Sequence, residues 1–290
     1  MRGLAWGAVL VLLAGCADLP GIRSPALPIR FLLTFDDGPA VSSLFDDRPS
    51  TVRVLETLAA NPVQPGIKAI FFVQTRAWNA GGTDAGRALL RREHAEGHLL
   101  AVHTGTPEGH VVHVRLTPAE LEQSLAHAKA DIAAITGTMP GIVRPPMWWY
   151  DQDTVASYER AGLAMLLTDL NAFDGNVWIN FSLRKRSNLR EQLARVKREA
   201  ALGKLPAMEG VTPVVVTLHD VNSHTARSLT EYLQILVEEA DALGIPLASR
   251  PFYDRRDDLE RAARLRAFQT PRPQRDASYN PPLSNLSFAQ

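Results

Sequence analysis

The sequence contains one cysteine, Cys16, among its 290 residues. A domain that follows this residue can form no internal disulfide. The chain also has no net charge, because 31 Lys and Arg residues balance 31 Asp and Glu residues. It lacks the basic excess that is typical of nucleic-acid-binding proteins. Two Arg-rich stretches, 184–198 and 254–266, are interleaved with Glu, Asp and Leu. This pattern favours solvated helix faces, and we expect no nucleic-acid partner.

The apolar stretch at the start of the chain, residues 3–13, follows Met1-Arg2. It is too short to span a bilayer, which takes about 20 residues, but it suits a secretory signal. It ends in Leu13-Ala14-Gly15-Cys16, a tetrad that resembles the lipobox of bacterial lipoproteins. The resemblance implies a signal peptide over residues 1–16, a lipid anchor at Cys16 and no transmembrane helix. The alternative is an ordinary signal peptide with an incidental cysteine.

The rest of the chain divides into three parts. Residues 17–27 are expected to form a tether, and residue 17 is Ala rather than Asp. That choice favours the outer membrane, so we expect a cell-envelope protein anchored at the periplasmic face of the outer membrane. Residues 28–255 are the predicted folded domain. Residues 256–290 are expected to form a C-terminal helix and a poorly ordered tail, because the last 21 residues are rich in Pro, Ser, Asn and Gln.

The folded domain shows a regular alternation of patterns. With 46% apolar residues, the chain can bury one large core. Apolar runs predict strands at 29–35, 67–73, 99–102, 141–144, 164–169, 214–218 and 246–249. Amphipathic segments between them predict helices at 50–60, 83–96, 117–136, 151–161, 189–202 and 228–243. Thr117-Pro118-Ala119-Glu120 is a strong helix start, with a cap residue, Pro at the first position and Glu at the third.

This alternation predicts the fold class. Strands that alternate with helices pair in parallel through right-handed crossovers, so seven strands predict an α/β protein with a distorted or incomplete (β/α) barrel. No internal repeat is visible. In such barrels the chemistry sits at the carboxyl ends of the strands. Polar residues follow five of the predicted strands, and we expect them to share one rim: Asp36-Asp37, His103, Arg144, the stretch from Asp169 to Asp174, and His219-Asp220.

Two adjacent carboxylates end the first predicted strand, in Leu33-Thr-Phe-Asp-Asp-Gly-Pro39. Their side chains begin on opposite sides of the strand. Gly38 and Pro39 then turn the backbone, which lets both carboxylates line one cleft. Two like charges so close are costly unless a cation or a catalytic task requires them. A solvated turn is the alternative interpretation, and the downstream rim residues favour the functional one.

Histidines cluster after the third predicted strand. An Asp oxygen and two imidazoles suit a divalent metal with positions left open for water. Asp37, His103 and one of His110 or His113 are the candidate ligands. His103 ends a strand, which favours a functional role for it. His94, His127 and His224 are interpreted as exposed histidines, and His98, at a helix-to-strand junction, as a structural one.

Three further candidates follow later strands. His219 ends a strand with a buried pattern, and a histidine at that place can donate a proton near neutral pH. Arg144 precedes two prolines, which keep the backbone extended and present its guanidinium to the rim. Because arginine cannot act as a base, its expected task is to hold a carboxylate such as Asp36. Met147 and Trp148 are candidates for the wall of a sugar-sized cleft, with core packing as the alternative.

These segments together resemble the motifs of polysaccharide deacetylases, the carbohydrate esterase family four with its NodB-type domain. The matching segments are Thr34–Pro39, His103-Thr104, Arg144-Pro-Pro146 and Leu218-His-Asp220, supported by Ala69-Ile-Phe-Phe-Val73 and Glu96-Gly-His98. Their order and rough spacing both match, and the resemblance covers about Pro28 to Tyr253. It implies a hydrolase that removes acetyl groups from N-acetylated or O-acetylated sugars of an envelope or extracellular polysaccharide.

The resemblance also implies roles for individual residues. Asp37, His103 and His110 would hold a divalent metal, most simply Zn²⁺, with Co²⁺, Ni²⁺ or Mn²⁺ as alternatives. Asp36 would be the general base, oriented by Arg144. His219, polarised by Asp174, would protonate the leaving amine. A backbone N–H near Met147 would help to stabilise the oxyanion, and Leu218 would border the pocket for the acetyl methyl.

The sequence departs from the family pattern at three places. The family places its two metal histidines four residues apart, but position 107 is Pro. His110, after a loop three residues longer, is preferred over His113 as the second histidine. The segment from Thr168 to Gly175 lacks the family's Trp, and Met147 replaces the usual Tyr. These changes predict an altered substrate cleft. The alternatives to a deacetylase are a non-catalytic glycan-binding lipoprotein and a hydrolase of a non-sugar C–N bond.

Overall fold

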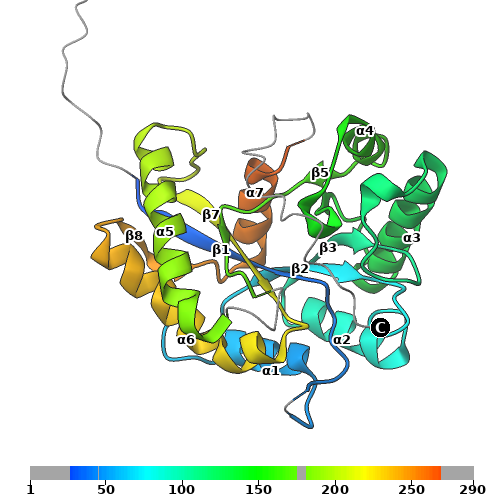
Figure 1. The fold of residues 1–290 in the computed structure, drawn as a ribbon, viewed down its shortest axis with the longest axis horizontal. Coiled ribbons are helices and arrows are strands. Elements are labelled where there is room, and N and C mark those ends of the chain that lie inside the picture. The colour runs from blue at the N-terminus through cyan, green and yellow to red at the C-terminus, as the bar shows by residue number, and fades with distance from the viewer. Residues whose placement is uncertain (1–26, 45, 175–180, 269–290) are drawn as a thin grey trace, which may run out of the picture.

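The computed structural model describes residues 27–44, 46–174 and 181–268. Within these ranges, strands alternate with helices as the sequence predicts (Figure 1). The strands are β1 Ile29–Asp36, β2 Ala69–Gln74, β3 Leu99–Thr104, β4 Ile142–Val143, β5 Ala164–Met165, β6 Leu170–Asn171, β7 Thr212–His219 and β8 Leu247–Phe252. The α-helices are α1 Ser50–Ala59, α2 Asp84–Ala95, α3 Pro118–Thr136, α4 Gln152–Arg160, α5 Phe181–Ala201, α6 Ser223–Ala242 and α7 Arg256–Arg266.

The strands form one parallel sheet in the order β5-β4-β3-β2-β1-β7-β6. β5 and β6 stand at the two ends of this order, yet only residues 166–169 separate them in the chain. Seven strands laid flat would place the outer two roughly 29 Å apart, whereas five residue steps reach at most about 18 Å. The sheet must therefore curl, which confirms the predicted α/β fold with a distorted, incomplete barrel.

The strand count differs from the predicted seven, because the run 164–169 is not one strand. β5 pairs with β4, and β6 pairs with β7 at the other end of the sheet. The residues between them cross the gap: Leu166 N donates to Val143 O, and Asp169 N donates to Val215 O. An apolar run shows that a segment is buried, but it does not show that the chain changes partner strands within it.

β1 is the centre of the sheet and has three neighbours. β7 pairs with it along its whole length, from Ile29 to Asp36. β2 pairs only with the second half of β1, from Leu33 onward, and β8 pairs with the first half, at Ile29 and Phe31. β1 is thus fixed on both sides up to its last residue, so Asp36 ends on a rigid strand.

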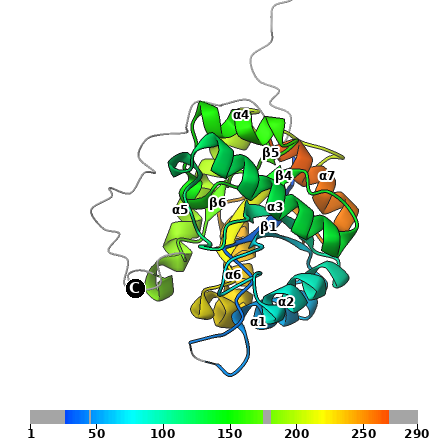
Figure 2. The ribbon, with the colours of Figure 1, turned by 90° about the vertical axis from the view of Figure 1, so that its right-hand side faces the viewer.

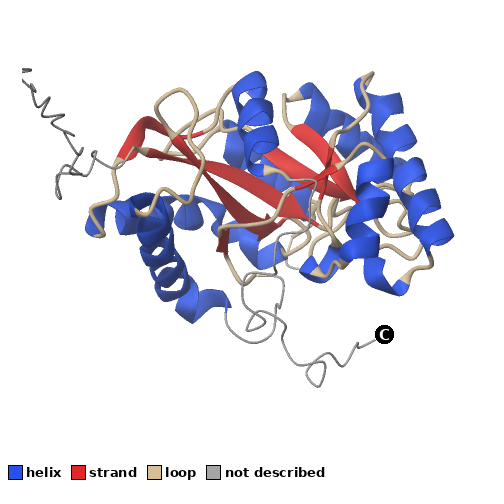
Figure 3. Cartoon of the chain, turned by 90° about the horizontal axis from the view of Figure 1, so that it is seen from above, coloured by secondary structure: helices blue, strands red, loops and turns tan. Residues whose placement is uncertain are grey.

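Side-chain alternation along the strands separates two apolar clusters. The larger cluster contains Phe31, Leu33 and Phe35 together with residues of α1, α3, α4, α5 and α6. The smaller one contains Leu32, Ile70, Phe72 and Val215 with the buried residues of α7. Figure 2 shows α5 and α7 on opposite sides of the molecule, and Figure 3 shows helices flanking the strands. α7 thus covers the inner side of the curled sheet, through Leu259, Ala262 and Ala263.

Several helix boundaries follow the predicted signals. Thr117 caps α3, and its hydroxyl accepts from Glu120 N while the Glu120 side chain accepts from Thr117 N, which confirms the predicted capping box. α6 begins at Ser223, five residues before its predicted start, because Asn222 caps it and accepts from His224 N and Thr225 N. Within the described ranges, no helix is both long and apolar enough to cross a membrane. Cys16, the signal peptide and the C-terminal tail lie outside the described residues.

Candidate active site

Three predicted ligand residues meet beyond the carboxyl ends of β1 and β3. The Nε2 atom of His103 lies 3.0 Å from Oδ1 of Asp37, and Nε2 of His110 lies 3.2 Å from the same oxygen. The three ligand atoms of this cluster all lie within 4.8 Å of one another. The structure therefore brings together the three residues that the sequence analysis assigned to one metal.

The hydrogen bond of His103 Nδ1 determines which atom its other ring nitrogen can bind. Its Nδ1 is 2.9 Å from the backbone oxygen of Arg144, which can only accept, so Nδ1 carries the hydrogen. In the neutral ring, Nε2 is then an acceptor that faces another acceptor, Oδ1 of Asp37. Both atoms are buried, and neither has a hydrogen-bond partner among the described residues. Buried acceptors that face one another call for a cation, and one carboxylate with two imidazoles fits a divalent metal such as Zn²⁺.

The charges around the cluster favour its ligand form. Burial by itself raises the pKa of Asp37, but the neighbouring rings of His110, His103 and His219 outweigh burial and hold this pKa well below its usual value. Burial lowers the pKa of His110. Asp37 is therefore held in its ionised form, and burial shifts His110 towards its neutral form. These are the forms that bind a metal.

The second candidate histidine, His113, takes a different place. Its Nδ1 lies 2.6 Å from the hydroxyl of Tyr158, and its side chain is fully buried. Burial lowers its pKa to about 3, so it is a neutral core residue. Among the two alternatives that the sequence left open, the structure places His110 beside Asp37 and His113 against α4.

Asp36 lies beside the cluster and is held by Arg144, as predicted. The Arg144 guanidinium is fully buried, and its Nη1 donates to Oδ1 of Asp36 at 2.7 Å. The same nitrogen donates to the Thr34 hydroxyl at 2.6 Å, and Nε donates to Leu166 O at 2.9 Å. Arg144 thus fixes the Asp36 carboxylate from inside the barrel. A buried ion pair is stable only when hydrogen bonds compensate for the loss of water around both charges. The bonds of Arg144 to Thr34, Asp36 and Leu166 O provide this compensation.

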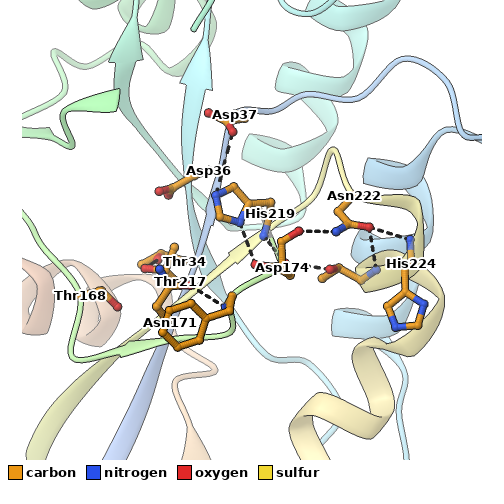
Figure 4. A network of polar contacts seen from close by, with 12 residues as sticks. Thr34, Asp36, Asp37, Thr168, Asn171, Asp174, Thr217, His219, Asn222 and His224 are labelled. Atoms are coloured by element: carbon orange, nitrogen blue, oxygen red, sulfur yellow. Dashed lines mark hydrogen bonds and ion pairs between the residues drawn. The ribbon is translucent and has the colours of Figure 1, made fainter. Parts of the chain in front are cut away.

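His219 and Asp174 form the other half of the site (Figure 4). The Nδ1 atom of His219 lies 2.8 Å from Oδ1 of Asp174. The backbone N of His219 and the Thr225 hydroxyl both donate to Oδ2 of Asp174 at 2.8 Å. Asn222 also donates to the backbone oxygen of Asp174. Nε2 of His219 points towards Asp37 and lies 4.0 Å from its Oδ2, so the free end of the ring faces the ligand cluster.

Asp174 changes the charge of His219. Burial by itself lowers the pKa of His219, but the Asp174 carboxylate and its hydrogen bond outweigh burial and raise this pKa to about 10. In the metal-free protein the ring is therefore an imidazolium at neutral pH. It is able to donate a proton from Nε2 while Asp174 holds Nδ1.

This shift predicts a pH-dependent stability in the metal-free protein. Below about 6.5, the unperturbed value, His219 is protonated in the folded and the unfolded chain, and its contribution is complete. Between about 6.5 and about 10 only the folded chain keeps the proton, so the free energy of unfolding falls as the pH rises. We expect the stability difference between wild type and His219→Gln, measured by urea unfolding with chelator present, to shrink across this range. A difference that is independent of pH contradicts this assignment.

Two other predicted rim residues, Asp220 and Asp169, are not members of the ligand cluster. Asp220 is fully buried under the turn at Gly38, where it accepts from the Thr51 hydroxyl. A Cβ atom at Gly38 would lie 2.4 Å from Oδ2 of Asp220, so only glycine fits there. Asp169 accepts from Val215 N at 2.9 Å and from Arg266 at 2.5 Å. Asp169 therefore ties α7 to the sheet and does not reach the rim.

The predicted cleft residues have mixed placements. Trp148 is half-buried, and its ring centroid lies 4.9 Å from the Arg144 guanidinium, which also lies 4.1 Å from the Phe72 ring. Met147 and Trp148 both have left-handed backbones, with φ of 59° and 63°. Leu218 is buried in the larger apolar cluster, on the opposite side of β7 from Thr217. Its predicted contact with an acetyl methyl stays a prediction, as do the cleft roles of the other two residues.

The sequence analysis missed three residues that support the site. Thr34 precedes Asp36 by two positions and therefore shares its face of β1, a signal that the alternation offered. Asn222 and Thr225 open α6 and hold Asp174, and the Asn-Ser-His-Thr sequence after β7 is a helix-capping signal. Asn222 and Thr225 act on the site only because Asp174 lies beside them. Asp174 is 45 residues from His219 in the chain, so no local sequence pattern predicts these contacts.

The fold and this site define a class: an incomplete α/β barrel whose rim carries two carboxylates, a buried arginine and three histidines. Comparison with known proteins agrees. Residues 26–166 match the model of the polysaccharide deacetylase family. The chain is 24% identical to a chitin deacetylase of Pestalotiopsis sp over 211 residues, which are 67% of this chain and 65% of that relative.

Two further relatives extend the comparison. A chitooligosaccharide deacetylase of Bradyrhizobium sp. (strain ANU 289) is 34% identical over 148 residues, 51% of this chain and 56% of that relative. The chain thus spans less than two thirds of the length of these two relatives. The solved chitin deacetylase of Colletotrichum lindemuthianum matches with a TM-score of 0.54 and 24% identity, covering 77% of this chain and 85% of that structure. This match shows the shared fold.

Proposed function

We propose that this protein is a metal-dependent deacetylase that removes acetyl groups from N-acetylated sugars of a polysaccharide. One observation carries the proposal. The buried acceptors of Asp37 and His103 face each other with no hydrogen-bond partner in the described part of the chain. They lie between an arginine-held carboxylate and an aspartate-held histidine. This arrangement contains a cation site, a base and an acid within one rim, which are the three functions that amide hydrolysis needs.

Asp36 is the proposed base. Arg144 and the strand end fix its carboxylate, so the base is oriented without a conformational search. It accepts a proton from the attacking water. Because Arg144 also donates to Thr34, the guanidinium keeps its position while the charge on Asp36 changes.

His219 is the proposed acid. The Asp174 carboxylate holds Nδ1 and leaves Nε2 facing the ligand cluster. The imidazolium donates its proton at Nε2 to the nitrogen of the leaving sugar amine, which makes that amine a better leaving group. Asp37, His103 and His110 are the residues that would hold the metal. When bound, a divalent cation supplies Lewis-acid polarisation of the acetyl carbonyl and acidifies water.

The substrate class follows from the relatives. The names of two of them specify chitin and chitooligosaccharides, so we infer that this chain acts on N-acetylglucosamine-containing glycans. The half-buried Trp148, which flanks Arg144, supports a sugar-binding wall. A hydrolase of O-acetylated sugars or of non-sugar C–N bonds would use the same residues.

The test is acetate release from chitooligosaccharides by purified protein with Zn²⁺. We expect release in the presence of the metal and loss of release after treatment with a chelator, restored by Zn²⁺, Co²⁺, Ni²⁺ or Mn²⁺. Peptidoglycan fragments, acetylated xylan and small acetamides serve as parallel substrates. Metal-loaded protein that binds the oligosaccharides but releases no acetate from any of these substrates contradicts the proposal and favours a glycan-binding protein.

We also propose that the chain is lipid-anchored at Cys16 in the cell envelope. The support is the Leu13-Ala-Gly-Cys16 tetrad after an apolar stretch, a segment that lies outside the described residues. Expressed in a bacterium with a labelled fatty acid, the wild-type chain is expected to take up label, and Cys16→Ser is expected to lose it. Equal labelling of both chains, or of neither, contradicts the anchor.

A further inference from the structure

We propose that Gln74 is a positioning residue that sets the affinity of Asp37, His103 and His110 for a divalent cation. This inference rests on the metal site of the proposed function. Gln74 is the last residue of β2 and is 7% exposed. Among the described residues, its side chain donates to Asp37 O. Its side chain connects the two chain segments that carry Asp37 and His110.

On one side, Gln74 fixes the backbone of Asp37. The backbone N of Gln74 donates to Gly38 O at 2.8 Å, and its side-chain Nε2 donates to Asp37 O at 2.9 Å. Asp37 has a φ of 72°, a left-handed conformation that is unfavourable for a non-glycine residue. Such a conformation persists only where neighbouring contacts hold it. Here both carbonyls that flank the turn accept from one glutamine.

On the other side, the Gln74 side chain packs against the loop between His103 and His110, at Gly109. Gly109 precedes His110 and has a φ of 83°. A Cβ atom at Gly109 would lie 2.5 Å from Oε1 of Gln74 and 3.2 Å from Cβ of Ala77. The loop backbone therefore packs directly on the glutamine amide, at a distance that only glycine allows.

Two more contacts hold the same loop. Trp78 N donates to Pro107 O at 3.1 Å, and Gly105 N donates to the Ser124 hydroxyl at 3.0 Å. The loop from His103 to His110 places its two ligands seven positions apart, and a longer loop has more conformations to lose on closing. The contact between Gln74 and Gly109 limits the conformations of the loop and so reduces the entropy that is lost when His110 binds a metal. His110 is the more exposed of the two imidazoles.

The amide of Gln74 thus holds the backbone of Asp37 through Nε2 and packs against Gly109, next to His110, through Oε1. Groups that orient metal ligands typically account for about 10- to 100-fold in metal affinity when they are mutated. Gln74→Met keeps the length of the side chain but removes the donor to Asp37 O. We expect this variant to bind Zn²⁺ about 10- to 100-fold more weakly than wild type.

Gln64→Met is the matched control. Gln64 is a buried glutamine too, at 5% exposure. Its Nε2 donates to Phe252 O at 2.9 Å, and its Oε1 accepts from Phe252 N at 3.0 Å. It therefore joins backbone segments as Gln74 does, but beside β8 and not beside the ligands. A general loss of packing affects both variants, whereas a positioning role affects only Gln74→Met.

The experiment is a competition titration of full-length metal-free protein with Zn²⁺ and a chromophoric chelator. Each variant is first checked by circular dichroism, and Gly109→Ala, which places a Cβ against the Gln74 amide, is titrated as a second variant in case Gln74→Met does not fold. Weaker binding by Gln74→Met or Gly109→Ala, with Gln64→Met equal to wild type, supports the inference. Wild-type affinity in Gln74→Met, or in a folded Gly109→Ala when Gln74→Met fails to fold, overturns it, as does an equal loss in Gln64→Met. Wild-type protein that binds no Zn²⁺ overturns the cation site itself, and with it the proposed function.

Discussion

Asp36→Asn is expected to lower kcat/KM for deacetylation of a chitooligosaccharide by about 10²- to 10⁴-fold, the usual contribution of a general base. Asparagine has nearly the shape of aspartate and keeps an oxygen that accepts from Arg144 Nη1, a contact of 2.7 Å in the wild type. It has no carboxylate to take the proton of the attacking water. The measurement is the rate of acetate release at saturating Zn²⁺.

The control for this variant is its metal content. Asp37, His103 and His110 do not include Asp36, so Asp36→Asn is expected to bind one Zn²⁺ per chain as wild type does. The combination of retained metal and lost activity separates a base from a ligand. Activity within tenfold of wild type, in protein with bound Zn²⁺, rules out Asp36 as the base.

Arg144→Met is expected to destabilise the protein by about 3–5 kcal/mol, the typical result of removing one partner of a buried ion pair. The guanidinium is fully buried and donates to Asp36, Thr34 and Leu166 O. Methionine fills part of its volume but leaves the Asp36 carboxylate buried without its cation. Urea unfolding of the metal-free proteins measures the difference in the free energy of unfolding.

A double-mutant cycle tests whether the loss comes from the ion pair. Arg144→Met leaves the Asp36 carboxylate without its cation, and Asp36→Asn leaves the buried guanidinium without its opposite charge. The double variant Asp36→Asn/Arg144→Met should therefore lose less than the sum of the two single variants. A loss of about 1 kcal/mol or less for Arg144→Met, the range of an exposed pair, contradicts the buried ion pair. Additive losses in the cycle contradict the coupling between the two residues.

The fold class was predictable because it depends on local patterns. Alternating apolar runs and amphipathic segments specify a parallel α/β sheet, and the capping box at Thr117 specifies the start of a helix. The path of residues 164–171 was not predictable from the same patterns. The chain leaves β4 at Met165 and joins β7 at Leu170. The apolar residues from Ala164 to Leu167 give one signal that continues past the end of β5.

The members of the site were predictable to the extent that they end strands. Asp36, His103 and His219 are fixed by parallel strand register, which aligns their strand ends along one rim. The choice between His110 and His113 was different. It depends on the left-handed turn at Gly109 and on the hydroxyl of Tyr158, which is 45 residues from His113. Contacts of this kind are set by tertiary structure, and no spacing rule contains them.

The most direct test of the account is the position of the metal in crystals of the protein grown with Zn²⁺. An anomalous difference map at the zinc absorption edge is expected to show one strong peak per chain, within bonding distance of Asp37 Oδ1, His103 Nε2 and His110 Nε2. These three atoms already lie within 4.8 Å of one another. A map with no peak there, or with zinc held by other residues, contradicts a catalytic cation at this rim.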